Sequence, residues 1–154
     1  MTILEAIEEV AGTILPVPTF YYADLNEANI DADPLANSAF PLMIVLPIVP
    51  TDNPSKSGVL KTTMTLQFFM LNKKTDQYTI QYNSVVIENE IIAPMRSLAR
   101  EFMFKLNRHS IVDPETAGAT NIRYEPTYSA LDANCHGVFV TASVPFMEKI
   151  TGCS

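Results

Sequence analysis

Apolar residues recur every three or four positions between Asn83 and Arg108, the longest stretch of the chain with a helical pattern. This spacing places them along one side of an α-helix, with most of the charged residues on the other sides. Pro94 interrupts the pattern because it cannot donate a hydrogen bond to the carbonyl of Glu90. We therefore expect a kink or a restart of the helix near residues 90–94. The predicted buried stripe consists of Ile92, Met95, Ala99, Phe102 and Leu106.

A shorter helix is predicted from Thr2 to about Thr13. Thr2 and Glu5 have the spacing of a capping box, in which each side chain accepts a hydrogen bond from the backbone N–H of the other residue. Pro16 and Pro18 prevent the helix from continuing. Its predicted buried stripe is Ile3, Ile7, Val10, Ala11 and Ile14.

Elsewhere the pattern changes to alternation or to short apolar runs, which are typical of β-strands. Strands are predicted at residues 19–23, 40–49, 59–71, 122–128 and 138–146, with residues 78–82 as a short strand or as the approach to the long helix. The strand from Val59 to Leu71 alternates most regularly, with Leu60, Met64, Leu66, Phe68 and Met70 on one face. Residues 24–38, 50–58, 72–77 and 110–118 have the composition of loops and turns.

The run from Phe40 to Val49 is apolar on both sides, which favours a central strand covered on both faces. Strands that follow one another after short turns favour antiparallel pairing. We therefore predict a single α+β domain over residues 1–154. It has a mostly antiparallel sheet of about four to five strands, with the N-terminal helix and the long central helix packed on it.

The composition adds that the protein is apolar and acidic, with 47% hydrophobic residues, 18% charged residues and a net charge of −7. No basic cluster exceeds Lys73-Lys74, which argues against wrapping nucleic acid, although an acidic surface can line a passage through which DNA slides. Cys135 and Cys153 are too few for a disulfide scaffold. No stretch has the pattern of a secretory signal or of a membrane span, so we expect a soluble protein made in a cytoplasm.

Candidate chemistry is sparse. His109 ends the long helix, where a cation favours the helix dipole. Cys135 and His136 are neighbours, and neighbours on an extended chain point to opposite sides, which disfavours a catalytic dyad. Asp31, Asp33 and Asn37 superficially suggest a calcium loop, but the glycine and the terminal glutamate of such a loop are missing. We expect no catalytic, cofactor or metal site and no enzyme activity.

Several strands carry apolar residues on the side opposite their core face, and the long helix carries Phe104 beside its main stripe. Such surfaces commonly pack against another chain. The alternative is that the N-terminal helix covers the back of the sheet. The residues predicted to form a subunit interface are Val59, Lys61, Phe69, Leu71, Phe104 and Phe139.

The order of these elements resembles a family of phage proteins. An aromatic strand with nearby Asn (FYYADLN) is followed by an acidic loop, a Phe-Pro strand (FPLMIVLP), an alternating strand, a long helix rich in Met, Arg and Phe, and a C-terminal hairpin (LDANCHGVFVTASV). This resembles the tail-terminator and head–tail connector proteins of tailed bacteriophages, most closely the neck ring proteins of crAss-like and other Bacteroides phages.

The resemblance implies a structural virion protein that is made in the host cytoplasm and has no cofactor and no membrane contact. Its copies would form a homo-oligomeric ring, of about six or twelve subunits, between portal and tail. DNA would pass through the lumen without sequence-specific binding. The loops at residues 24–38 and 50–58 would dock on adjacent portal, connector or tail proteins, and we name Asp31, Asp33, Asp52 and Lys56 as candidate docking residues.

Two other functions remain open from the sequence. One is a small soluble ligand-binding α+β domain with a pocket between helix and sheet. The other is a hydrolase that uses Cys135 and His136.

Overall fold

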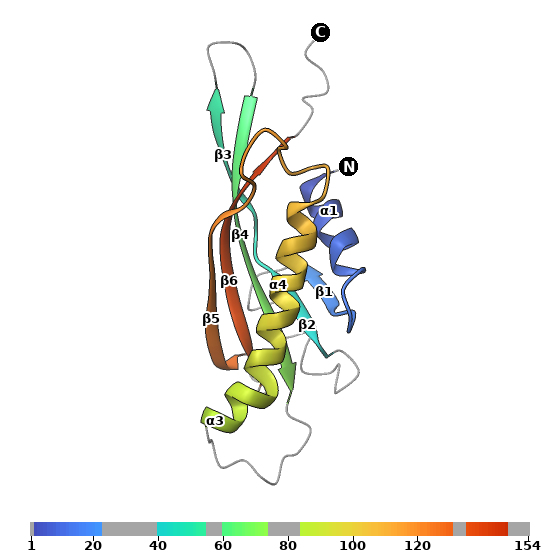
Figure 1. The fold of residues 1–154 in the computed structure, drawn as a ribbon, viewed down its shortest axis with the longest axis vertical. Coiled ribbons are helices and arrows are strands. Elements are labelled where there is room, and N and C mark those ends of the chain that lie inside the picture. The colour runs from blue at the N-terminus through green and yellow to red at the C-terminus, as the bar shows by residue number, and fades with distance from the viewer. Residues whose placement is uncertain (1, 23–39, 55–59, 74–83, 131–134, 148–154) are drawn as a thin grey trace.

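The computed structural model describes residues 2–22, 40–54, 60–73, 84–130 and 135–147 (Figure 1). It confirms the α+β class, with an N-terminal helix, a long central helix and a mostly antiparallel sheet. The elements in chain order are α1 (Ile3–Ala11), β1 (Thr19–Tyr22), β2 (Leu42–Val45), β3 (Val49–Pro54), β4 (Leu60–Lys73), α3 (Ser84–Ile87), the π-helical segment η3 (Glu88–Ile92), α4 (Ala93–Asn107), β5 (Thr120–Ala130) and β6 (Cys135–Phe146).

Helix α1 begins with the capping box that the sequence predicts. The backbone N–H of Glu5 donates to Thr2 Oγ1 over 3.2 Å, and the N–H of Thr2 donates to Glu5 Oε2 over 2.8 Å. These two bonds satisfy N–H groups that otherwise have no partner within the helix. The whole predicted stripe is buried, including Ile14, which lies just beyond the end of α1.

The long helix is interrupted at the predicted place. Before Pro94 the backbone forms the π-helical segment η3, and the N–H of Ala93 donates to the carbonyl of Glu88, five residues earlier. Pro94 lies in the first turn of α4, where its missing N–H costs least. The interruption thus follows from the proline, and α4 restarts a regular ladder that runs to Asn107.

Strand β4 lies in the centre of the sheet, which has the order β1-β2-β4-β6-β5, with β3 also paired to β4. It pairs along its length with β6 on one side, while its other side pairs with β3 in its first half and with β2 in its second half. All these pairs are antiparallel, but β1 and β2 are parallel. The prediction of antiparallel pairing concerned strands joined by short turns, and it did not cover β1 and β2, which a long predicted loop separates.

The prediction of a loop over residues 50–58 is wrong for residues 50–54, which belong to β3. Two prolines made this segment resemble a loop, but prolines are tolerated on an edge strand because one row of N–H groups has no partner there. A side-chain bond supports the pairing, since Thr62 Oγ1 donates to Asp52 Oδ1 over 2.9 Å.

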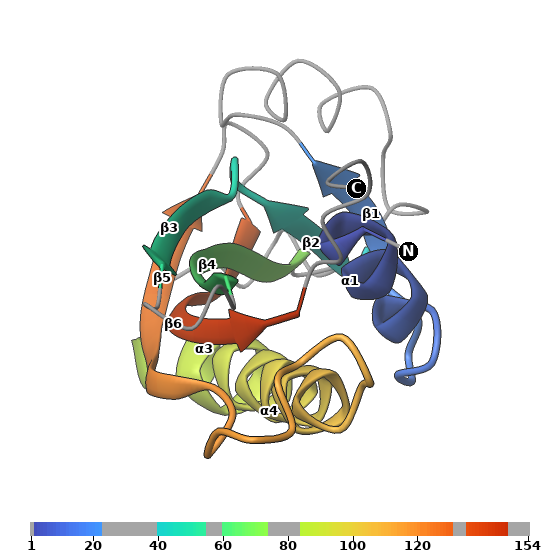
Figure 2. The same cartoon turned by 90° about the horizontal axis from the view of Figure 1, so that it is seen from above.

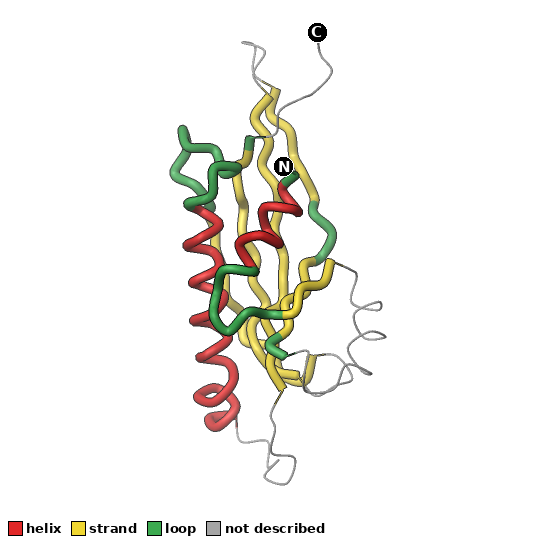
Figure 3. The backbone as a smooth tube through the Cα atoms, turned by 90° about the vertical axis from the view of Figure 1, so that its right-hand side faces the viewer, coloured by secondary structure: helices red, strands yellow, loops and turns green. Residues whose placement is uncertain are grey.

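Both helices cover the same face of the sheet (Figures 2 and 3). The main core lies between them and the strands, and Phe68 of β4 meets Phe102 of α4 edge to face with ring centroids 5.1 Å apart. From the strands this core takes Met43, Val45, Met64, Leu66, Phe68, Met70, Val138, Val140, Ala142, Val144 and Phe146. The predicted inward face of the 59–71 strand is confirmed at every position whose side chain the structure describes.

Strands β5 and β6 form the predicted C-terminal antiparallel pair. Strand β5 is longer than predicted at both ends, and β6 begins earlier than predicted and ends at the predicted residue, Phe146. Gly137 of β6 lies against the backbone of β4, and a Cβ atom at this position would overlap the carbonyl oxygen of Met70. The loop before β5 returns to the end of α4, where Asn107 Oδ1 accepts the N–H of Ala119 over 2.8 Å. The predicted loop at 24–38 and the segment at 78–82 lie outside the described residues.

Candidate subunit interfaces

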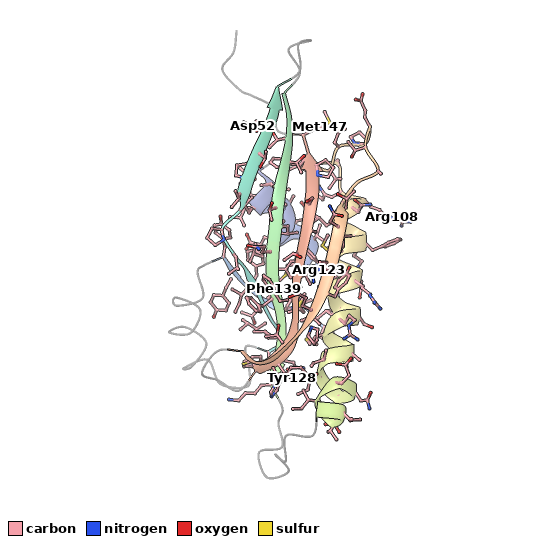
Figure 4. All side chains as sticks on the ribbon, turned by 90° about the vertical axis from the view of Figure 1, so that its left-hand side faces the viewer. Asp52, Arg108, Arg123, Tyr128, Phe139 and Met147 are labelled. Carbon is pink, nitrogen blue, oxygen red and sulfur yellow. The ribbon has the colours of Figure 1, made fainter. Side chains whose placement is uncertain are left out.

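The face of the sheet opposite the helices carries a second, smaller apolar cluster. Its buried centre consists of Leu42, Ile44, Leu71 and Cys135, against which Tyr21, Phe40, Leu46 and Phe69 pack. Phe69 and Phe139 are direct neighbours across β4 and β6, with ring centroids 4.7 Å apart and planes tilted by 35°. We call Phe69 and Phe139 the outer aromatic pair (Figure 4 labels Phe139). The sheet is therefore apolar on both faces in this region, as the pattern of β2 and β4 predicted.

The structure divides the residues predicted to form a subunit interface between two surfaces. Phe69, Leu71 and Phe139 gather on the outer face of the sheet. Leu71 is fully buried within the chain itself, so of these three residues only the outer aromatic pair, which is half-buried, is accessible to a neighbouring molecule. Lys61 lies farther along β4, opposite Asn53. Val59 lies outside the described residues.

Phe104 lies on the opposite side of the molecule, on α4, and is 59% exposed. It forms a stripe with two arginines at four-residue spacing, Arg100 and Arg108, all on one side of the helix. The guanidinium carbon of Arg108 lies 4.4 Å from the centre of the Phe104 ring, and that of Arg100 lies 5.4 Å from the centre of the Tyr124 ring on β5. We call Arg100, Phe104 and Arg108 the α4 stripe; Arg108 is labelled in Figure 4.

The other basic residues of α4 are held by carboxylates. Arg96 pairs with Glu88 at 2.9 Å, and Lys105 pairs with Glu101 at 3.3 Å and donates to the carbonyl of Thr13 over 2.8 Å. The arginines of the stripe instead lie over aromatic rings. A guanidinium that lies over a ring face keeps its edge N–H groups available to a carboxylate or phosphate.

The sequence reading missed the α4 stripe. The pattern assigned most charged residues of the helix to the sides away from its buried stripe, and Phe104 was selected only as an apolar residue beside that stripe. The signal was present as the four-residue spacing of Arg100, Phe104 and Arg108, which puts the three side chains side by side on any α-helix.

Of the predicted docking residues, only Asp52 lies among the described residues. It belongs to β3 rather than to a loop, and it accepts the hydroxyl hydrogen bond of Thr62. Asp52 thus holds an edge strand to its neighbour. Asp31, Asp33 and Lys56 lie outside the described residues.

Cys135 and His136 point to opposite faces of β6. The Cys135 side chain belongs to the second apolar cluster, whereas the His136 ring meets the ring of Tyr128 with centroids 6.4 Å apart. Burial raises the pKa of the Cys135 thiol to about 11, against a smaller lowering by Lys73. A thiol nucleophile requires the reverse, a lowered pKa and a base within hydrogen-bond reach.

His109 lies just beyond α4 and connects three parts of the chain. Its Nε2 lies 3.4 Å from Glu9 Oε2 on α1, and its Nδ1 accepts the N–H of Ile111 over 3.2 Å. Because Nδ1 accepts, the neutral ring carries its proton on Nε2 and can donate it to Glu9. His109 therefore holds α1 to the end of α4, a structural role.

A cleft of about 390 Å³ opens beside the loop after α4, between Asn107 and Gly118. Several polar atoms on its lining already have partners in the chain. Asp113 Oδ1 accepts the N–H of Glu115, Asn107 Oδ1 accepts that of Ala119, and both ring nitrogens of His109 are engaged. The space between α4 and the sheet, where the alternative function predicts a ligand pocket, is filled by main-core side chains that include Phe68 and Phe102.

Within the described residues, no group of three or more His, Cys, Asp or Glu side chains is arranged to hold a metal ion. No described helix has both the length and the apolar character needed to cross a membrane. No protein-family model matches the sequence, and no curated protein is significantly similar to it.

Proposed function

We propose that this protein is a structural subunit of a homo-oligomeric ring in the neck or tail of a tailed phage. The ring would join portal to tail and surround the DNA passage. The observation that carries the proposal is the placement of partly exposed aromatic residues on two opposed sides of one chain. The outer aromatic pair lies on one side, and Phe104 lies on α4 on the other.

A closed ring needs this arrangement. In a head-to-tail interface, each subunit presents one surface to the neighbour before it and a different surface to the neighbour after it. A twofold dimer needs only one self-complementary patch. Two separate surfaces on one small chain therefore favour rings over dimers, and the element order that resembles phage neck proteins favours the same assembly.

Size determination under native conditions, followed by electron microscopy of the largest species, tests the proposal. We expect closed rings with a central opening that weakly repels DNA, because the chain carries a net charge of −7. A chain that stays monomeric across the micromolar range would overturn the proposal. The phage assignment is tested separately by gene context, where portal, capsid and tail genes are expected to lie beside this one.

The cleft beside the loop after α4 is the observation that favours a small ligand-binding domain instead. The ring is the better-supported function because several polar groups that line this cleft are satisfied within the chain. A saturable rise in melting temperature with a metabolite, abolished by a Thr116→Tyr substitution that fills the cleft, would reverse this preference.

A further inference from the structure

Acidic residues predominate on α1 and basic residues on α4. Helix α1 contains Glu5, Glu8 and Glu9 and no basic residue. Helix α4 contains Arg96, Arg100 and Lys105 and is followed by Arg108; its one acidic residue, Glu101, pairs with Lys105. Glu9 lies beside His109, while Glu5 and Glu8 are exposed. The exposed side of α1 is therefore acidic, and the α4 stripe is basic and aromatic.

These two surfaces do not face each other within one molecule. In the view along the long axis, β5 and α1 flank α4 on opposite sides (Figure 2). Arg100 reaches toward β5, because its guanidinium lies over Tyr124. The α4 stripe is thus directed away from α1 of the same chain.

We infer that the α4 stripe of one copy docks on the acidic face of α1, Glu5 and Glu8, of the next copy. This rests on the proposed ring function and names what the Phe104 side of the chain contacts. The surface that it meets is α1 of the next copy, and the outer aromatic pair, on the other face of the sheet, lies outside this contact. Arginine guanidinium groups form charge-assisted hydrogen bonds with carboxylates. At Glu5 the contact uses the carboxylate oxygen that does not accept the N–H of Thr2. Phe104 between the two arginines supplies apolar area that becomes buried. A contact between different surfaces on opposite flanks is head-to-tail, the kind that generates a ring.

Nucleic acid is the competing partner for an arginine–aromatic stripe. Duplex DNA carries a charge about every 1.7 Å along its axis, and a site must neutralise several phosphates to bind it. The stripe offers two arginines in a chain with a net charge of −7. The two carboxylates of Glu5 and Glu8 on a second copy equal the two arginines of the stripe in number. The acidic residues elsewhere on the chain would repel DNA.

Charge reversal on each side of the contact tests the inference. The double variant Arg100→Glu/Arg108→Glu and the single variant Glu8→Lys are each expected to weaken self-association, measured by sedimentation over a concentration series. Loss of one or two partly exposed charge pairs corresponds to a rise of roughly tenfold in the dissociation constant. The variant that combines all three changes should recover part of the lost association. Wild-type association should also weaken as salt is raised.

Arg123→Glu is the matched control. It makes the same Arg→Glu substitution at a single position on β5, where the side chain is 71% exposed and pairs with Glu125 at 2.8 Å. We expect it to associate like the wild type. Arg108 also stabilises the C-terminal end of α4 through the helix dipole, so its loss can weaken folding as well as docking. Thermal unfolding of each protein, and the neutral variant Arg100→Gln/Arg108→Gln, separate these two effects.

The outcomes distinguish the two proposals. A wild-type protein that remains monomeric contradicts both. A wild-type oligomer that neither Arg variant weakens overturns the α4 stripe contact and leaves the ring intact. Wild-type protein that binds duplex DNA at low salt, with binding lost in the Arg variants and association unchanged, assigns the stripe to nucleic acid and overturns the inference.

Discussion

The rings of Phe69 and Phe139 lie 4.7 Å apart, centroid to centroid, across β4 and β6 on the face of the sheet opposite both helices. Their neighbours on these strands, Phe68 and Val140, point the other way into the main core. The two strands therefore supply two apolar layers at once. A sheet that divides its large side chains between both faces has more to bury than two helices on one face can cover.

The outer aromatic pair should contribute to stability as a unit. Phe69→Leu and Phe139→Leu together should cost less than the sum of the single changes, with a coupling of about 0.5–1.5 kcal/mol. Because the chain contains no Trp, urea unfolding followed by circular dichroism measures the three variants. Additive losses would show that the two rings are neighbours without an energetic interaction.

Gly137 should be irreplaceable even by alanine. A Cβ atom there would overlap the carbonyl oxygen of Met70, and neither strand can move aside without breaking the β4–β6 ladder. Gly137→Ala should lower the free energy of unfolding by roughly 2–4 kcal/mol or prevent folding.

Gly12→Ala is the matched control for this substitution. Gly12 has helical dihedral angles, φ −71° and ψ −9°, and a Cβ atom would come no closer than 3.4 Å to the carbonyl oxygen of Glu9. Alanine at this position should be neutral or stabilising by about 0.4–1 kcal/mol. Equal effects of the two substitutions in thermal unfolding would contradict the close approach at Gly137.

The capping box at the start of α1 should be measurable in the same way. Thr2→Ala removes the acceptor for the N–H of Glu5 and should cost about 1 kcal/mol. Thr2→Ser keeps the hydroxyl oxygen and should retain most of the stability. If Thr2→Ser loses as much as Thr2→Ala, the methyl group rather than the hydrogen bond supports the helix.

The periodic segments could be predicted from sequence because their burial is local in origin. The stripe from Ile92 to Leu106 and the alternation from Met64 to Met70 each require one face toward the core, whatever the partner. The capping box and the interruption before Pro94 are likewise set by residues within one helical turn.

Pairing between distant segments could not be predicted in this way. Residues 50–54 form an edge strand because β4 extends beyond β2 and offers them backbone groups with which to pair. Their own sequence, rich in Pro and with an Asp, is typical of a loop and does not indicate this pairing. The parallel pairing of β1 with β2 likewise depends on the path of the chain between them. The α4 stripe was not predicted for another reason. The spacing of Arg100, Phe104 and Arg108 indicates a common exposed surface only when the inward side of α4 is known.

Because the Cys135 thiol is buried, we expect the free energy of unfolding to fall at alkaline pH. Burial raises its pKa in the folded chain to about 11, while in the unfolded chain it ionises near its ordinary value of 9.0. Ionisation therefore favours the unfolded state, and the stabilising contribution is complete below about pH 9 and lost as the pH rises to about 11. The pKa of Tyr124 is also raised, mainly by burial and against a lowering by Arg100, which adds a loss of the same sign.

Comparison of Cys135→Ala with the parent, both with Cys153→Ser, isolates the thiol. Urea unfolding between pH 8 and pH 11 should show a shallower decline for Cys135→Ala, because the contribution of the Cys135 thiol is removed. Parallel declines in the two proteins would contradict the raised pKa of the Cys135 thiol.

The central claim is that two unlike surfaces of this chain join copies head to tail. The most direct measurement is the mass of the purified wild-type protein under native conditions, at low salt and across the micromolar range, by mass spectrometry and sedimentation. The account predicts one discrete oligomer larger than a dimer, a closed ring of identical 17.1 kDa chains, that dissociates as salt increases. A single species of 17.1 kDa at every concentration and salt level would contradict it.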